Sequence, residues 1–277
     1  MYFTVLWSVL ALISCADQLV IDEASGGLPH VEPACEFQML MEKARWGDGK
    51  AYLKLADCYR DGRGVKQDFI GMLSMASLAD DYGGINRIEE YLDSLPKDSE
   101  YKLIIDCVEK LEHKQTEEAQ ALIERIATNG SPDGYAIKGI SIMEHGDSIE
   151  AIHLFEHAAE NGSSFAELLL CISDWREAKN PRMEKLEALV DKIPWVCNIL
   201  AETYIGRRGS LMNDNNMAAY YYLKADQHVC LTRNGAKSLL SYIRNGGDLH
   251  LGATDLERLQ ILAGEELIMD LDTIVIQ

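Results

Sequence analysis

Proline and phenylalanine are scarce in this sequence of 277 residues, which contains 6 prolines and 5 phenylalanines. Its periodic segments are dominated instead by Ala, Leu, Glu and Lys, which favour helix over strand. Basic residues are also few, since 26 Lys and Arg face 45 Asp and Glu and give a formal net charge of −19. This balance argues against binding to nucleic acid, where Lys and Arg neutralise phosphates. It also disfavours docking on an anionic membrane surface.

Cysteine pairs with metal-binding spacing are missing as well. None of the seven cysteines forms a C-x-x-C pair, and no spacing matches a set of zinc ligands. Most of them lie in segments of helical periodicity, where a free cysteine behaves as a small apolar residue. We therefore expect structural thiols, with disulfides an open alternative if the protein is exported. The cysteines beyond the N-terminal region are Cys35, Cys58, Cys107, Cys171, Cys197 and Cys230.

The apolar run over residues 1–14 is too short for a membrane-spanning helix, which needs about 20 apolar residues. It has instead the length of the apolar region of a secretory signal. Its end, Leu12-Ile13-Ser14-Cys15, resembles the lipobox of bacterial lipoproteins, although no Lys or Arg precedes the run. In such proteins the signal is cut before the cysteine, and the thiol is then acylated.

This resemblance implies that residues 1–14 are a signal peptide and that Cys15 carries a lipid. The protein would then be exported and anchored as a lipoprotein of a bacterial cell envelope. The polar residues 15–33, which include two adjacent glycines, would form a flexible tether to the folded body. Two alternatives stay open: a simple signal anchor, and a packed N-terminal helix of a cytoplasmic protein.

Three segments of the sequence resemble one another and predict repeated helix pairs. The first two begin with a glycine and a polar turn, continue with a helical segment, a glycine-containing break and a second helical segment, and close with a glycine. The three copies start at Gly47, Gly130 and Trp195, and the second copy closes at Gly162. More degenerate helix pairs lie between the copies, at residues 99–130 and 163–193.

The first copy contains LADCYRDGRGVKQD, residues 55–68, followed by an Ala-rich helical segment. The distinctive positions are Leu55, Ala56, Tyr59, Gly62, Gly64, Val65, Asp68, Ala76 and Ala79. This pattern resembles the Sel-one-like repeat, a short relative of the tetratricopeptide repeat. The resemblance implies an all-α fold, an α-solenoid of stacked antiparallel helix pairs. It also implies an adaptor or scaffold role in protein complexes, with no catalytic residues and no cofactor. We expect about 12 helices over residues 34–272 and a short strand or tail at 273–277.

Elementary rules explain the central part of this motif. Gly62 falls where the first helix must stop, and glycine adopts the left-handed C′ conformation without steric cost. Gly64 allows a second tight bend, after which Val65 can return to the groove between the helices. Asp68 suits the start of the next helix, because its carboxylate accepts hydrogen bonds from free amides. The small Ala76 allows the second helix to approach its neighbour closely.

One short pattern suggests a different chemistry. His153, Glu156 and His157 form an H-x-x-E-H sequence, in which two histidines one turn apart could bind zinc while the glutamate acts as base. A zinc-dependent hydrolase is therefore the alternative function. The repeat pattern explains the same helix through packing at Ala151, Leu154, Phe155, Ala158 and Ala159, which leaves both histidines toward its more exposed side.

Three consecutive tyrosines, Tyr220, Tyr221 and Tyr222, are candidates for contact with a partner, since tyrosine is favoured at binding hot spots. They cannot all point inward from one helix, so we expect at least one to be partly exposed; packing of two between repeats is the alternative. The sequence as a whole predicts a non-catalytic protein-interaction scaffold. Its concave side would hold a peptide or a partner domain of unknown identity.

Overall fold

The computed structural model describes residues 33–128, 130–173, 183–206, 214–249 and 251–265. Within these ranges the chain forms 14 helices and no strand, which confirms the all-α prediction. The signal segment, Cys15, the tether to residue 32 and the tail at 273–277 lie outside the described residues. No described helix is both long and apolar enough to cross a membrane.

Twelve of these helices form six consecutive antiparallel pairs. The first helices of the middle pairs begin at Glu100, Pro132, Ser164 and Val196, so this register repeats every 32 residues. The pairs are α3 (Gly49–Asp61) with α4 (Phe69–Asp81), α6 (Glu100–Glu112) with α7 (Thr116–Thr128), α8 (Pro132–Glu144) with α9 (Ser148–Glu160), α10 (Ser164–Ser173) with α11 (Met183–Leu189), α12 (Val196–Tyr204) with α13 (Asn215–Gln227), and α14 (Arg233–Arg244) with α15 (Ala253–Ala263). The two remaining helices are α2 (Pro33–Ala44) and the short α5 (Ile88–Ser94).

The loop between α3 and α4 has the predicted geometry. Gly62 ends α3 in the left-handed region, with φ +69°, and its N–H donates to the carbonyl of Cys58. Gly64 is also left-handed, with φ +74°. Asp68 is the N-cap of α4 and accepts a hydrogen bond of 3.0 Å from the N–H of Ile70. The positions predicted to pack do so: Leu55, Ala56, Ala76 and Ala79 are fully buried, and Tyr59 and Val65 are half-buried against the core.

The closing glycines of two later pairs have the same role. Gly130 follows α7 with φ +66°, and Gly162 follows α9 with φ +92°. In each case the left-handed residue lets the chain turn directly into the next helix. That helix then starts from a serine, Ser131 for α8 and Ser163 for α10. Ser131 and the following proline therefore act as N-cap and first helical residue.

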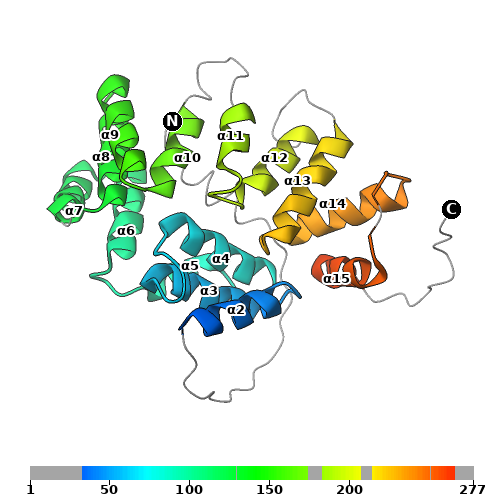
Figure 1. Cartoon of the computed structure of the whole chain (residues 1–277). Coiled ribbons are helices and arrows are strands. Elements are labelled where there is room, and N and C mark those ends of the chain that lie inside the picture. The colour runs from blue at the N-terminus through cyan, green and yellow to red at the C-terminus, as the bar shows by residue number, and fades with distance from the viewer. Residues whose placement is uncertain (1–32, 129, 174–182, 207–213, 250, 266–277) are drawn as a thin grey trace.

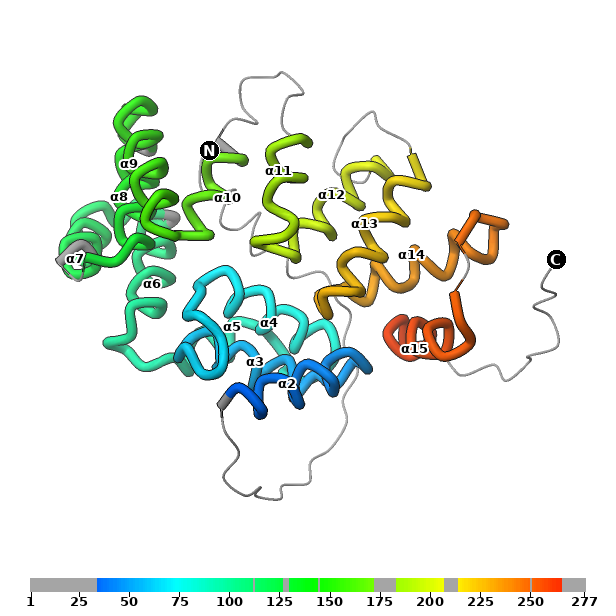
Figure 2. Tube along the Cα trace, in the orientation of Figure 1, coloured from blue at the N-terminus to red at the C-terminus, as the bar shows by residue number. Residues whose placement is uncertain are grey.

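The pairs from α6/α7 to α14/α15 follow one another along an arc, and the first pair lies inside it (Figure 1). Figure 2 shows the chain returning at its C-terminal end, where α15 comes close to the loop after α2. There a Cβ placed on Gly47 would lie 3.2 Å from Leu262. A simple solenoid repeat touches only its neighbours in sequence. This array is different, because its first and last pairs are in contact.

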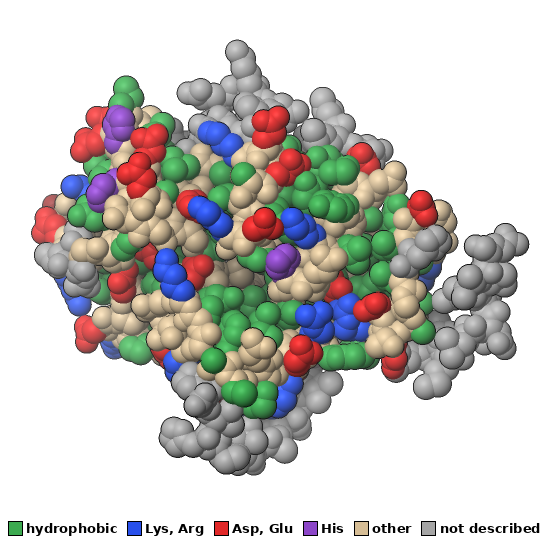
Figure 3. All heavy atoms as spheres, in the orientation of Figure 1, with side chains coloured by type: hydrophobic (Ala, Val, Ile, Leu, Met, Phe, Trp, Pro, Cys, Tyr) green, Lys and Arg blue, Asp and Glu red, His purple; other side chains and the backbone are tan. Residues whose placement is uncertain are grey.

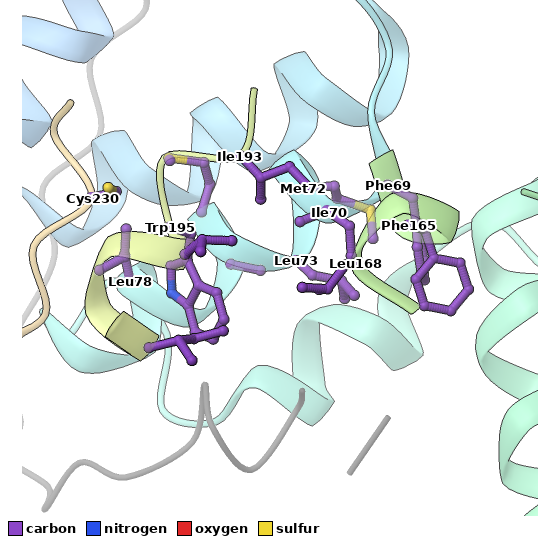
Figure 4. Packing of buried hydrophobic residues seen from close by; sticks show 14 of the residues in the cluster. Phe69, Ile70, Met72, Leu73, Leu78, Phe165, Leu168, Ile193, Trp195 and Cys230 are labelled. Carbon is purple, nitrogen blue, oxygen red and sulfur yellow. The ribbon is translucent and has the colours of Figure 1, made fainter. Parts of the chain in front are cut away.

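The α4 helix is the centre of that arrangement. Eleven of its 13 residues are buried, on all sides of the helix, as expected for a helix that is apolar all round. At its N-terminal end the ring of Phe69 lies 5.1 Å from Tyr101 of α6 and 5.3 Å from Phe165 of α10. Figure 4 shows this row of contacts continuing past Leu73 to Trp195, at the start of α12.

The C-terminal end of α4 is fixed to the last helix pair by hydrogen bonds. The hydroxyl of Tyr82 donates to the carbonyl of Leu231 over 2.7 Å. The carboxylate of Asp81 accepts from the backbone N–H of Arg233 over 2.5 Å, and the Arg233 guanidinium donates to the Asp81 carbonyl over 3.0 Å. We call the first helix of each pair after α3/α4 an inner helix; these are α6, α8, α10, α12 and α14. The inner helices therefore surround α4 from one end of the arc to the other.

Candidate interaction surfaces

The H-x-x-E-H helix is α9, and its packing follows the repeat interpretation. Ala151, Phe155 and Ala158 are buried, whereas His153 and His157 are exposed. Figure 3 shows histidine side chains on the molecular surface over this helix. His153 lies 3.3 Å from Glu156, and the His157 ring packs at 4.7 Å against Tyr135.

Among the described residues, no third metal-binding group lies near these two histidines. Across the described ranges, no three His, Cys, Asp or Glu side chains are grouped so that they could hold a metal ion. The Glu156 carboxylate, which would act as the base in the hydrolase hypothesis, faces His153 on the exposed side of α9. Among the described residues, the α9 pattern therefore lies on a solvated helix face.

The three consecutive tyrosines separate into two groups. Tyr221 and Tyr222 are 5% and 1% exposed, which agrees with the alternative in which two of the tyrosines pack between repeats and leaves these two little surface for a partner. Tyr220 is 53% exposed and remains a candidate. The ring of Tyr221 stacks on Tyr204 at 5.7 Å, and its hydroxyl donates to Glu187 of α11 over 2.7 Å. This pair joins α11, α12 and α13, a structural role.

The interior of the arc, where the sequence predicts the partner site, is filled by the chain itself. Phe69 and Leu73 of α4 are buried and fill the space that the inner helices face. An open concave groove along these helices is therefore not present among the described residues. The candidate sites for a partner are therefore the clefts at the edges or on the outside of the array.

The first of these clefts, which we name the loop cleft, lies between the α3–α4 loop and the N-terminal ends of α8 and α10. It consists of two adjoining cavities of about 330 Å³ and about 300 Å³, both lined by Lys66, Gln67, Asp133, Gly162 and Ser163. The ammonium of Lys66 reaches across the cleft, since a Cβ on Gly162 would lie 3.2 Å from it.

Serine–carboxylate pairs line the walls of the loop cleft. The hydroxyl of Ser163 donates to Asp133 over 2.5 Å and accepts from the N–H of Ala166 over 3.0 Å. The hydroxyl of Ser164 donates to Asp68 over 2.5 Å, and that of Ser131 donates to Glu100. Each pair joins two different repeats, and each serine stands at or next to the start of an inner helix.

These carboxylates are engaged in holding the repeats together. Burial raises the pKa of Asp133 to about 6 from its ordinary value of 3.8, while its hydrogen bond from Ser163 acts in the opposite direction. No histidine is among the described residues that line either cavity, so a serine activated by a neighbouring imidazole is not formed there. The loop cleft is thus a hydrogen-bonded seam between repeats.

The second cleft, the α13–α14 groove, has a different chemistry. Its volume is about 430 Å³, within the range of ligand-binding clefts. The floor is apolar and small, formed by the buried Ala218, Ala219 and Tyr222. Neutral polar side chains and one base complete the lining: Asn215, Lys237, Ser238, Ser241, Tyr242 and Asn245, with Ile205. Unlike the loop cleft, this groove is lined by no described carboxylate.

Sequence reasoning missed both clefts. The serines of the loop cleft do leave a signal, because Ser99, Ser131 and Ser163 recur at the 32-residue spacing of the inner helices. The α13–α14 groove also has a signal in the sequence, because α14 contains three basic residues and no acidic residue in a chain with a net charge of −19. In both cases the informative pattern is the position of polar residues relative to the repeat.

Comparison with known proteins gives a likeness in structure but none in sequence. No protein-family model matches the chain, and no curated protein matches it. Among solved structures, it is similar to the crystal structure of a Sel1 repeat protein from Oxalobacter formigenes, with 16% sequence identity and a TM-score of 0.38. The alignment covers 83% of this chain and 98% of that one. The helix pairs and the closure around α4 described above rest on contacts within this chain.

Proposed function

We propose that this chain is a non-catalytic scaffold that binds other proteins through clefts on the outside of a preassembled helical body. The observation that carries the proposal is the closure of the array around α4, which leaves the α13–α14 groove open on a framework already fixed by packing. A preorganised surface loses little conformational entropy when a partner binds. The exposed ring of Tyr220 supplies a second contact of the kind common at interfaces.

The experiment is affinity purification of the full-length chain from its native source after mild crosslinking. Under the scaffold proposal, at least one protein is recovered in a constant ratio to the chain, and the recovery survives replacement of both His153 and His157 by alanine. A chain that is recovered alone would overturn the proposal. Stoichiometric zinc, together with function lost in the double alanine variant, would favour the hydrolase instead.

We also propose that the scaffold is exported and held at a bacterial cell envelope by acylation of Cys15. Its support is the apolar run that ends at Leu12-Ile13-Ser14-Cys15. The intact mass of the protein purified from the membrane fraction tests this directly. A species that starts at Cys15 with added acyl mass is expected, and Cys15→Ser should abolish it. An unprocessed chain in the soluble fraction would contradict the anchor without affecting the scaffold proposal.

A further inference from the structure

The end of α4 and the start of α14 meet in a contact that we name the α4–α14 seam (Figure 1). It consists of Asp81 and Tyr82 on one side and of Leu231 and Arg233 on the other. Each of the three hydrogen bonds given above for these residues pairs a side chain with a backbone group. The Arg233 guanidinium donates to the backbone carbonyl of Asp81, whereas the Asp81 carboxylate accepts from a neutral N–H.

Asp81 is thus buried in the seam without an ion pair. No Lys or Arg in the described ranges forms a salt bridge with its carboxylate. The buried Asp226 on α13 differs, because both terminal nitrogens of the Arg258 guanidinium donate to it. An unpaired buried charge is costly, whereas a neutral carboxyl still offers an oxygen to the N–H of Arg233. The seam is therefore most stable when Asp81 is neutral.

Several titratable and charged groups surround Asp81 and the two adjoining tyrosines. They are Tyr52, Asp80, Tyr82, Asp226, Cys230, Arg233, Lys237 and Arg258. Burial is the largest effect on Asp81 and raises its pKa to about 6, against the N–H and the charge of Arg233, which lower it. Asp80 raises this pKa further, and Lys237 lowers it. Burial also raises the pKa of both tyrosines above the ordinary value of 10, so neither phenol ionises in the same range.

The turn that leads into the seam contains a strained residue. Val229 has φ +57°, in the left-handed region, which is unfavourable for a β-branched side chain. Residues of this kind persist only where the surrounding structure holds them, and they are common in segments that switch. The side-chain amide of Asn198 on α12 holds the turn from one side, since it donates to the carbonyl of Cys230 over 2.8 Å. The seam with α4 holds it from the other side.

We propose that the α4–α14 seam is a pH-sensitive closure, in which ionisation of Asp81 promotes local opening of α14 and the turn before it away from α4. The closed seam holds the Asp81 proton more tightly than the open one, so its stability is lost as pH rises through about 6. Release from α4 also lets the backbone of Val229 relax. This inference goes beyond the proposed scaffold function, because it makes the closure of the array respond to pH.

Amide hydrogen exchange of the full-length chain is the test, with residues 132–144 of α8 as the reference for residues 229–240. After correction for intrinsic exchange, we expect residues 229–240 to have a larger opening constant and a weaker dependence on urea, which mark local opening. Their opening constant should rise about tenfold between about pH 5 and pH 7. That factor follows from a pKa of about 6 in the closed seam and 3.8 in the open one.

Three variants separate the Asp81 charge from the other contacts of the seam. Asp81→Asn keeps an oxygen for the N–H of Arg233 and cannot ionise, so its opening constant should lose the rise with pH. Tyr82→Phe removes the hydrogen bond to Leu231 and should raise the opening constant by a similar factor at both pH values. Asp98→Asn is the matched control, because the Asp98 side chain is 96% exposed, and it should follow wild type.

Two results would overturn the inference. One is an opening constant and a urea dependence that residues 229–240 share with α8, because the seam would then open only when the whole chain unfolds. The other is an opening constant that does not rise with pH in wild type, or that rises equally in wild type and Asp81→Asn. A rise that requires Asp81 and is confined to local opening supports the closure.

Discussion

Replacing Asp81 with asparagine should flatten the dependence of folding stability on pH, because this carboxyl lies where the two ends of the array meet. Asp81 is buried at the end of α4 and accepts a hydrogen bond from the N–H of Arg233. Burial raises its pKa to about 6 from the ordinary value of 3.8. Its other charged neighbours act in both directions, since Arg233 and Lys237 lower this pKa and Asp80 raises it.

The sign follows from comparing the two states. The folded chain holds the Asp81 proton more tightly than the unfolded chain, so this group contributes stability below its unfolded pKa and loses it as pH rises through about 6. The two pKa values differ by about two pH units, and each corresponds to about 1.4 kcal/mol. The free energy of unfolding should therefore fall by up to about 3 kcal/mol between about pH 4 and pH 7 from this group alone.

Urea unfolding of both proteins over that pH range is the assay. Asparagine keeps the oxygen that accepts from Arg233 and cannot titrate, so Asp81→Asn should lose most of this contribution. Asp133, whose pKa is also about 6, still titrates in the variant and leaves a smaller slope. The matched control is Asp98→Asn, since the Asp98 side chain is 96% exposed; its profile should parallel wild type. Parallel profiles for wild type and Asp81→Asn would refute the reasoning.

Two further perturbations test the packing around α4 and near the C-terminal end. Arg258 forms a buried bidentate pair with Asp226, so Arg258→Met alone should cost about 3–5 kcal/mol. The double change with Asp226→Leu should recover most of that loss by urea unfolding, and a double variant less stable than the single one would contradict this. A Cβ on Gly84 would lie 2.1 Å from the carbonyl oxygen of Gly49, so Gly84→Ala should lower the thermal midpoint markedly. A Cβ on Gly252 would meet only the Asp255 side chain, at the ordinary contact distance of 3.8 Å, so Gly252→Ala should change the midpoint little.

The helix pairs and the α3–α4 loop could be predicted because they follow short-range rules. Gly62 adopts the left-handed conformation that ends α3, which is the conformation that favours glycine at this position. Asp68 caps α4, as its position at the start of that helix predicts. The helix count was less accurate, since α2 and α5 fall outside the pattern of pairs. The pattern Thr-x-x-Glu from Thr254 to Glu257 is typical of a capping box, with Thr254 as N-cap and the helix starting at Asp255. The helix instead begins at Ala253, two residues earlier, and its N-cap, Gly252, makes no side-chain hydrogen bond.

The closure of the array could not be predicted from repeat spacing. Contacts such as Tyr82 with Leu231 join residues 149 positions apart in the sequence, and a pattern with a 32-residue period contains no information about them. A signal did exist in α4, whose sequence FIGMLSMASLADD contains no Lys, Arg or Glu and only two serines and two terminal aspartates among otherwise apolar residues. A helix at the end of an open solenoid would expose one side, so this composition already indicates burial on every side.

The central position of α4 separates stability from binding in this molecule. Residues of α4 such as Phe69 and Asp81 connect repeats distant in sequence, so their replacement should loosen several helix pairs together. Residues of the α13–α14 groove such as Lys237 and Ser241 are exposed and contribute little to that packing. Surface substitutions of this kind usually change stability by no more than about 0.5 kcal/mol. Exposed residues of this kind can therefore be replaced in a chain that remains folded, so the effect of such variants on partner recovery tests the scaffold proposal without a change in folding.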